Sequence, residues 1–197
     1  MDTGLLVIRI VVGLLLVGHG AQKLFGWFGG GGLNGTAWYF RSVGYRPPRL
    51  MAGLAGGAEL AGGAALAAGF MTPLAAAAVI GTMLNAAVAV HRRNGLWAVD
   101  NGYEYPLVVA TAAVTLSFTG AGAASLDARL GVGGPSIESG LLALILGLVA
   151  GSAVLISRAT ARSTARPASK SRPSTQVVIP QGSAEPRIRQ RSAVGQR

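Results

Sequence analysis

Five long stretches of apolar residues restrict this chain to one broad kind of fold. They occupy residues 5–21, 50–70, 73–90, 106–124 and 140–156. An α-helix rises about 1.5 Å per residue and the hydrocarbon core of a bilayer is about 30 Å thick, so about 17 to 25 apolar residues cross it. We therefore expect an all-α fold, a polytopic membrane helix bundle, because one water-soluble core does not bury five such segments.

The composition agrees with a membrane protein and excludes several kinds of chemistry. Hydrophobic residues make up 51% of the chain and charged residues only 12%, which is about half the share of a soluble domain. Cysteine is absent, so disulfides, dithiol exchange and thiolate metal sites are excluded. No metal-ligand cluster, nucleophile elbow or nucleotide loop is visible. The sequence therefore assigns no catalytic residue and no metal site, and it argues against an enzyme.

The basic residues are distributed very unevenly between the loops. With five crossing helices and an external N-terminus, fifteen of the 17 Lys and Arg residues fall on the inner side, Arg129 falls outside and Arg9 lies within the membrane. This asymmetry is the positive-inside pattern. It predicts an external N-terminus and a cytoplasmic C-terminus.

Nine of those basic residues lie in the C-terminal segment 158–197, which accounts for most of the net charge of +10. The segment is rich in Ser, Arg and Pro and has one acidic residue, so we predict a basic, disordered cytoplasmic tail. Two interpretations remain for it: a charge block that stops translocation, or a segment attracted to anionic lipid headgroups. No base-reading motif accompanies the charge, so nucleic acid is not an expected partner.

Two opposite charges lie deep inside the apolar stretches. Arg9 is in the first stretch and Glu59 is in the second. An unpaired charge at this depth is costly, and the two helices run in opposite directions. We therefore predict an intramembrane ion pair between Arg9 and Glu59.

A second group of polar residues is expected at the cytoplasmic mouth of the bundle. These residues end or begin three of the predicted helices: His19, Lys23, Asn85, His91, Tyr103 and Glu104. Together they form a candidate site for a polar headgroup or a quinone carbonyl, and a histidine there can also relay protons. The alternative is that each one anchors a helix at the interface or caps its end.

The connection between the first two helices, residues 25–49, is predicted to lie at the membrane interface. It contains Trp27, Trp38 and Tyr39, and Trp and Tyr favour the interfacial region. We expect a short interfacial helix over residues 36–43. The glycine run before it lacks the Lys-Ser/Thr ending of a phosphate loop, so nucleotide binding is not indicated.

Several short motifs, taken in order, resemble the DoxX family of small bacterial integral membrane proteins. The most distinctive is GHGAQKLFG at residues 18–26, and ELAGG at 59–63, MTPLA at 71–75 and GYEYP at 102–106 follow it. Two weaker elements are GTA at 35–37 and the GAG to SLD segment at 120–127. The resemblance covers about residues 4 to 130. It implies a four-helix membrane core over residues 1–130, which leaves 139–157 as an additional fifth transmembrane helix.

The resemblance also implies a place in the bacterial cytoplasmic membrane and a possible association with redox proteins. One lineage of the family is linked to a thiosulfate:quinone oxidoreductase, and other relatives to a membrane complex that detoxifies oxidants. The function expected here is a non-catalytic membrane subunit or anchor that supports a redox or oxidative-stress partner. Its expected contacts are the lipid bilayer and that partner. Quinone is the one cofactor considered, and lipid is the other candidate ligand. The alternative is a small transporter or permeability protein with a polar intramembrane pathway.

Overall fold

The described part of the chain is built from helices. The computed structural model describes residues 2–132 and 134–164, and Met1–Arg166 forms one compact unit. The α-helices are α1 (Asp2–Phe25), α2 (Gly32–Ser42), α3 (Pro48–Ala68), α4 (Thr72–Asn85), α5 (Glu104–Thr119), α6 (Leu126–Arg129) and α7 (Ile137–Thr164). A π-helical turn, Ala86–His91, extends α4, and no strand occurs in the residues described. The prediction of an all-α fold is confirmed.

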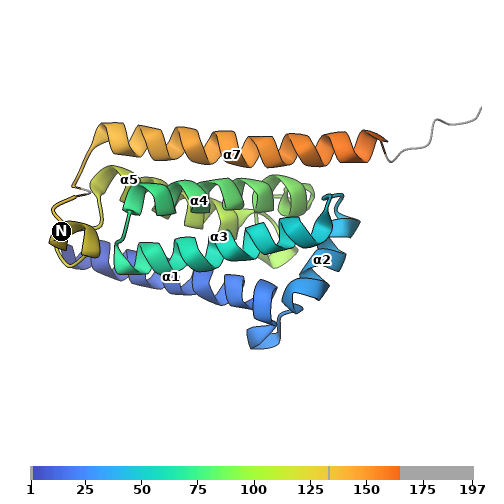
Figure 1. Cartoon of the computed structure of the whole chain (residues 1–197), viewed down its shortest axis with the longest axis horizontal. Helices are drawn as coiled ribbons and strands as arrows, with labels where there is room; N and C mark the ends of the chain where they lie inside the picture. The colour runs from blue at the N-terminus through green and yellow to red at the C-terminus, as the bar shows by residue number, and fades with distance from the viewer. Residues whose placement is uncertain (1, 133, 165–197) are drawn as a thin grey trace, which may run out of the picture. The chain divides into compact units, whose positions relative to one another are not determined.

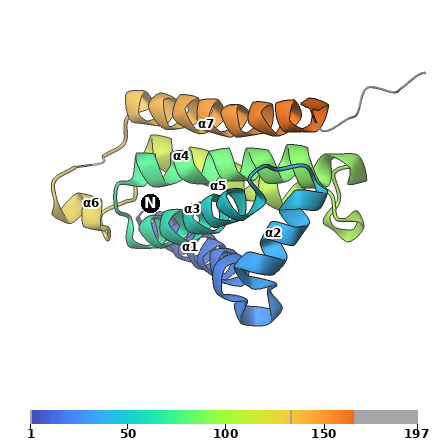
Figure 2. The ribbon, with the colours of Figure 1, turned by 45° about the vertical axis from the view of Figure 1, so that its right-hand side comes forward.

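Five helices, α1, α3, α4, α5 and α7, pack side by side in a bundle (Figures 1 and 2). The chain reverses direction between each of these helices and the next, so α7 runs parallel to α4 (Figure 1). One end of the bundle, called here the Asp127 end, carries the start of α1, the α3–α4 turn and α6. The other end, called the α2 end, carries α2, the α2–α3 loop and the segment between α4 and α5. Asp2 and Thr164 therefore lie at opposite ends, as five passes require.

Four helical segments in the described residues are long and apolar enough to cross a membrane. They are α1, α3, α7 and the segment Thr72–Asn94, which includes α4 and the turns after it. The predicted span at 106–124 is shorter than expected, because α5 ends at Thr119 and provides about 24 Å of helix. Gly120 and Gly122 follow with positive φ angles of 74° and 79°, a conformation that does not continue an α-helix.

The outer surface of the bundle is apolar, which is the reverse of a water-soluble helix bundle. On α1, Val11 and Leu14 are 52% and 58% exposed, and on α7, Leu142 and Val149 are 56% and 63% exposed. A contiguous apolar surface of this kind marks contact with lipid or with another protein. Together with the four long segments, it supports a multi-pass membrane protein.

Helices α1 and α3 approach each other closely through paired glycines. A Cβ atom on Gly13 would lie 2.5 Å from the carbonyl oxygen of Gly63, and one on Gly20 would lie 2.6 Å from the amide nitrogen of Leu60. Larger residues do not fit at these contacts, which is the usual role of glycine between membrane helices. The contacts fix the antiparallel register: Gly13 lies opposite Gly63, and Gly20 lies opposite Gly56 and Leu60.

Helix α7 packs on α4 in the same way and extends further than predicted. A Cβ atom on Gly147 would lie 2.8 Å from the carbonyl oxygen of Ala77, and one on Gly151 would lie 2.9 Å from that of Gly81. The helix covers residues 137–164, not 139–157, so the first seven residues assigned to a disordered tail are helical. The remainder of the predicted tail, residues 165–197, lies outside the described residues.

At the Asp127 end, one carboxylate holds the α3–α4 turn. Asp127 is buried, and it accepts hydrogen bonds from the amide of Met71 at 2.7 Å and from the amide and hydroxyl of Thr72 at 2.9 and 2.7 Å. Its own amide donates to the carbonyl oxygen of Gly69 at 2.8 Å. A carboxylate at the first turn of a helix satisfies free N–H groups and interacts favourably with the helix dipole. Asp127 therefore caps α4 from α6.

Asp127→Asn should lower the free energy of unfolding by about 1–3 kcal/mol, because an amide NH₂ would replace an accepting oxygen in front of buried donors. Unfolding by sodium dodecyl sulfate in mixed micelles measures this loss. Asp2→Asn is the matched control, since exposed Asp2 accepts only one long bond, 3.3 Å from the amide of Ala123. Equal losses for the two variants would show that Asp127 is not the cap on which this end depends.

Candidate functional site

A buried ion pair joins α1 to α3 at the α2 end. The ammonium of Lys23 contacts the carboxylate of Glu59. Glu59 is buried, whereas the Lys23 side chain is 26% exposed. The hydroxyl of Thr36, on α2, donates to the carbonyl oxygen of Lys23 at 3.2 Å, which ties α2 to the same place. The pair is therefore at the junction of three helices.

The predicted pair of Arg9 with Glu59 is wrong: each residue has a different partner. Arg9 donates to the carbonyl oxygen of Ala124, and the charge that acts on it is the carboxylate of Asp127. The glycine register explains the difference. It places Arg9 level with Gly69, ten residues further along α3 than Glu59, a separation of about 15 Å. The buried side chains of Leu16 and Leu66 fill the intervening level.

The ion pair lines a cavity of about 770 Å³ at the α2 end. Its walls come from α1, α2, α3, α4, α7 and the turn after α4. Most of the lining is small or apolar, and Lys23, Glu59, Asn85 and His91 are among its polar members. Two lining side chains, Leu54 and Trp38, are 55% and 73% exposed, so the cavity is partly open.

Asn85 lines this cavity but its amide is already engaged. The Asn85 NH₂ group donates to the carbonyl oxygens of Gly81, at 3.0 Å, and Gly151, at 2.9 Å. Its amide oxygen accepts from the hydroxyl of Tyr45 at 2.9 Å. The amide therefore joins α4, α7 and the α2–α3 loop, and its role is structural.

Tyr45 and Arg158 form a second link between α7 and the α2–α3 loop. The Arg158 guanidinium lies 5.4 Å from the centre of the Tyr45 ring, and it donates to the carbonyl oxygens of Val43, at 2.8 Å, and Ala89, at 3.3 Å. Burial raises the pKa of Tyr45 above its ordinary value, and the Arg158 cation partly opposes this. The phenol therefore stays protonated near neutral pH and can donate to Asn85.

The other predicted site residues lie around the cavity without lining it. His19 packs against the Tyr105 ring, with 5.1 Å between ring centres. Glu104 accepts from the amide of Ala98 at 2.8 Å, and the Tyr103 amide donates to the carbonyl oxygen of Gly95 at 3.1 Å. These two bonds close the segment between α4 and α5, which agrees with the capping alternative.

The structure thus divides the six-residue candidate site. Lys23, Asn85 and His91 line the cavity, whereas His19, Tyr103 and Glu104 do not. His91 also bonds through Nδ1 to the carbonyl oxygen of Asn101 at 2.7 Å. Among the described residues, no group of three His, Asp or Glu side chains is placed to hold a metal ion.

Sequence reasoning missed three residues that build the site: Thr36, Tyr45 and Arg158. Tyr45 lies two residues before Pro47 and Pro48. A tyrosine so close to two prolines is a weak sign of a loop with one fixed conformation. The sequence assigns Arg158 to the tail, because its spacing does not distinguish an arginine that contacts the bundle from one that is solvated. Its role depends on the longer α7.

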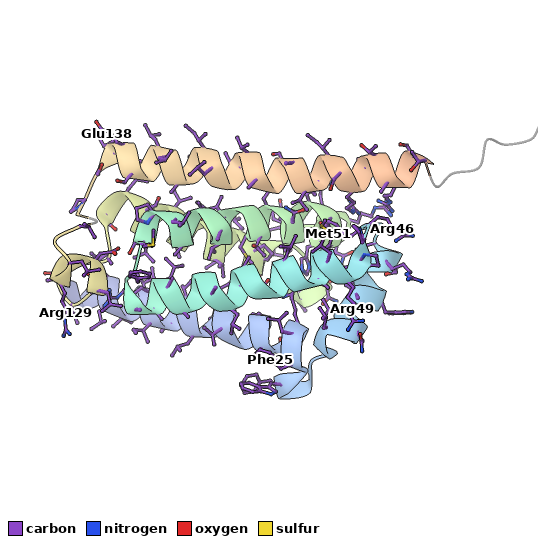
Figure 3. All side chains as sticks on the ribbon, viewed as in Figure 1. Phe25, Arg46, Arg49, Met51, Arg129 and Glu138 are labelled. Carbon is purple, nitrogen blue, oxygen red and sulfur yellow. The ribbon has the colours of Figure 1, made fainter. Side chains whose placement is uncertain are left out.

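Charge is concentrated at the same end of the bundle as the cavity. Eight of the ten Lys and Arg residues in the described ranges lie there: Lys23, Arg41, Arg46, Arg49, Arg92, Arg93, Arg158 and Arg162. Figure 3 shows Arg46 and Arg49 at this end and Arg129 and Glu138 at the other. The cavity therefore opens among cations.

The Lys23–Glu59 contact should show a coupling energy of about 1–3 kcal/mol in a double-mutant cycle of Lys23→Met and Glu59→Gln. The partial exposure of Lys23 keeps this value below that of a fully buried pair. Unfolding in mixed micelles measures each corner of the cycle. The control cycle, Arg9→Met with Glu59→Gln, should be additive within about 0.5 kcal/mol because the residues are far apart. Comparable coupling in both cycles would refute the observed pairing.

The comparisons with known proteins support the sequence resemblance. Residues 4–92 match the family model described as DoxX. No curated protein and no solved structure matches this chain. The matched segment contains Lys23, Glu59 and His91, and it ends before α5, α6 and α7, whereas the resemblance noted from short motifs reached about residue 130. The match supports membership of the DoxX family.

Proposed function

We propose that this protein is a non-catalytic membrane subunit that holds an amphipathic small molecule, a quinone or a lipid, in the cavity at its α2 end. In this role it supports a redox or oxidative-stress partner protein. The observation that carries the proposal is the Lys23–Glu59 pair at the wall of a largely apolar cavity of about 770 Å³. Small-molecule pockets are typically about 300–1,000 Å³ and mostly apolar, with a few placed polar groups.

The polar groups of this cavity suit the head of an amphiphile. Lys23 can donate a hydrogen bond to a carbonyl or ester oxygen, and Glu59 can accept one from a hydroxyl. Both kinds of group occur on quinones and quinols and on lipid headgroups. The remaining lining is apolar and suits the hydrocarbon part of either molecule.

The packing of the core favours binding over transport. The transporter alternative requires a polar route from Arg9 to Glu59. Leu16, Leu66 and Leu116 are fully buried in the described bundle and occupy its centre. A polar solute would have to displace this packed layer, whereas a ligand in the α2-end cavity needs no such displacement.

The surroundings of the cavity support a location near a membrane surface. The aromatic side chains of Phe25, Trp27 and Phe28 are 56%, 60% and 74% exposed at the end of α1, and Figure 3 shows Phe25 on the outside of the bundle. Exposed aromatic residues of this kind favour the bilayer interface. An amphiphile in the cavity would then have its head near the interface and its tail toward the hydrocarbon.

Filling the cavity should remove the ligand without disturbing the fold. Ala58 lines the cavity on α3, so Ala58→Phe should lower the binding of decylubiquinone or phosphatidylglycerol to the purified protein by at least about tenfold, a loss of about 1.4 kcal/mol. Native mass spectrometry of delipidated protein measures the binding. Ala64→Phe is the matched control, because Ala64 is exposed, does not line the cavity and lies about 120° around α3 from Ala58. A parent chain that binds neither probe would overturn the proposal.

The proposed orientation puts the α2 end in the cytoplasm of a bacterial cell, with the N-terminus outside. The concentration of basic residues at that end supports it. Because the chain has no cysteine, single cysteines report their own location. Arg93→Cys should resist an impermeant maleimide in intact cells, and Arg129→Cys should react with it. The reverse pattern would mean that the bundle is inserted the other way.

A further inference from the structure

One wall of the cavity comes from α7, which lies outside the segment that matches the family model. Ala150, Gly151 and Val154 of α7 line the cavity beside Ala78 and Gly81 of α4. The close glycine contacts of Gly147 and Gly151 bring the two helix backbones together there. This pair of helices forms a continuous wall of small residues, called here the α4–α7 wall.

The polar groups along the α4–α7 wall are satisfied within the protein. The carbonyl oxygens of Gly81 and Gly151 accept from Asn85. The hydroxyl of Thr82 donates to the carbonyl oxygen of Ala78 at 2.8 Å. A ligand beside this wall therefore meets mainly carbon and hydrogen. A sugar, an amino acid or an ion would lose its hydrogen bonds to water there without replacement, whereas a hydrocarbon chain would lose nothing.

The size of the cavity limits the ligand to one chain. At about 30 Å³ for each water-sized group, 770 Å³ holds about 25 such groups. This is enough for a ring-sized head and one long chain, and it is far fewer than a two-chain phospholipid contains. A second chain would have to remain outside, in the surrounding lipid.

We propose that the α4–α7 wall binds a single hydrocarbon chain of an amphiphile whose oxygen-bearing head lies at Lys23 and Glu59. The inference rests on the proposed function and deepens it, because it names the class of ligand and the helix that binds the tail. An alkyl or prenyl quinone and a single-chain lipid share this chemistry. The arginines at the α2 end favour the lipid if its head is anionic.

The test uses the purified full chain, delipidated in detergent, with two probes: decylubiquinone and palmitoyl-lysophosphatidylglycerol. Ala150→Phe should weaken the binding of whichever probe the parent binds by about tenfold, the loss expected when about two methylene groups are displaced from apolar contact. Ser152→Phe is the control, since Ser152 is exposed like Ala150 but does not line the cavity and lies about 200° around the helix from it. It should change binding by less than about twofold, well below that tenfold loss.

A gentler pair of variants covers the case in which Ala150→Phe disturbs folding. Ala150→Cys and Ser152→Cys each add the chain's one cysteine. The bound probe should slow maleimide labelling of Ala150→Cys several-fold and leave Ser152→Cys unchanged. If Ala58→Phe weakens probe binding while Ala150→Phe does not and Ala150→Cys is not protected, the inference is wrong and the proposed function stands. If the parent binds phosphatidylglycerol but neither of these two probes, the inference alone is wrong; if it binds none of the three, both are wrong.

Discussion

Where α1 and α3 meet, glycines bring the two backbones closer than any side chain would allow, and this contact decides the partners of Arg9 and Glu59. Gly13 lies opposite Gly63, and Gly20 lies opposite Gly56 and Leu60. With that register, Glu59 lies beside the α2 end of α1 and pairs with Lys23. Arg9 lies at the Asp127 end, where it donates to the carbonyl oxygen of Ala124 and is near the charge of Asp127. The two ends of the bundle thus have separate polar centres, and packed leucines lie between them.

These two polar centres differ in whether they border a cavity. At the Asp127 end, the carboxylate accepts hydrogen bonds from the start of α4, so it serves as a structural cap. At the α2 end, the ion pair borders a cavity that is open on one side. Asn85, Tyr45 and Arg158 support that cavity by joining α4, α7 and the α2–α3 loop through hydrogen bonds. The Asp127 carboxylate is enclosed by the groups that it bonds, whereas the Lys23–Glu59 pair, although bonded internally, borders the cavity.

Helix α7 lines part of the cavity but lies outside the segment that matches the family model. The matched residues 4–92 provide the ion pair and four of the five helices that line the cavity, and they end before α7, the fifth. Glycines at 147 and 151 let α7 pack directly on α4, and Arg158 secures its far end to the α2–α3 loop. A chain with the same first four helices and a different last helix would have a different cavity. The α7 half of the α4–α7 wall therefore lies outside the matched segment, whereas the α4 half lies within it.

Long apolar stretches were enough to predict the helical class, the membrane bundle and the approximate spans, because helix length and hydrophobicity are local properties. The importance of Lys23 and Glu59 was also visible, since a charge within an apolar stretch needs a partner. The pairing of Lys23 with Glu59 could not be predicted, because it depends on the register of α1 against α3. The register of α1 against α3, fixed by glycine contacts between distant segments, decides whether Glu59 meets Arg9 or Lys23. The same is true of Tyr45 and Arg158: they are 113 residues apart in the sequence, and packing of α7 on α4 brings them together.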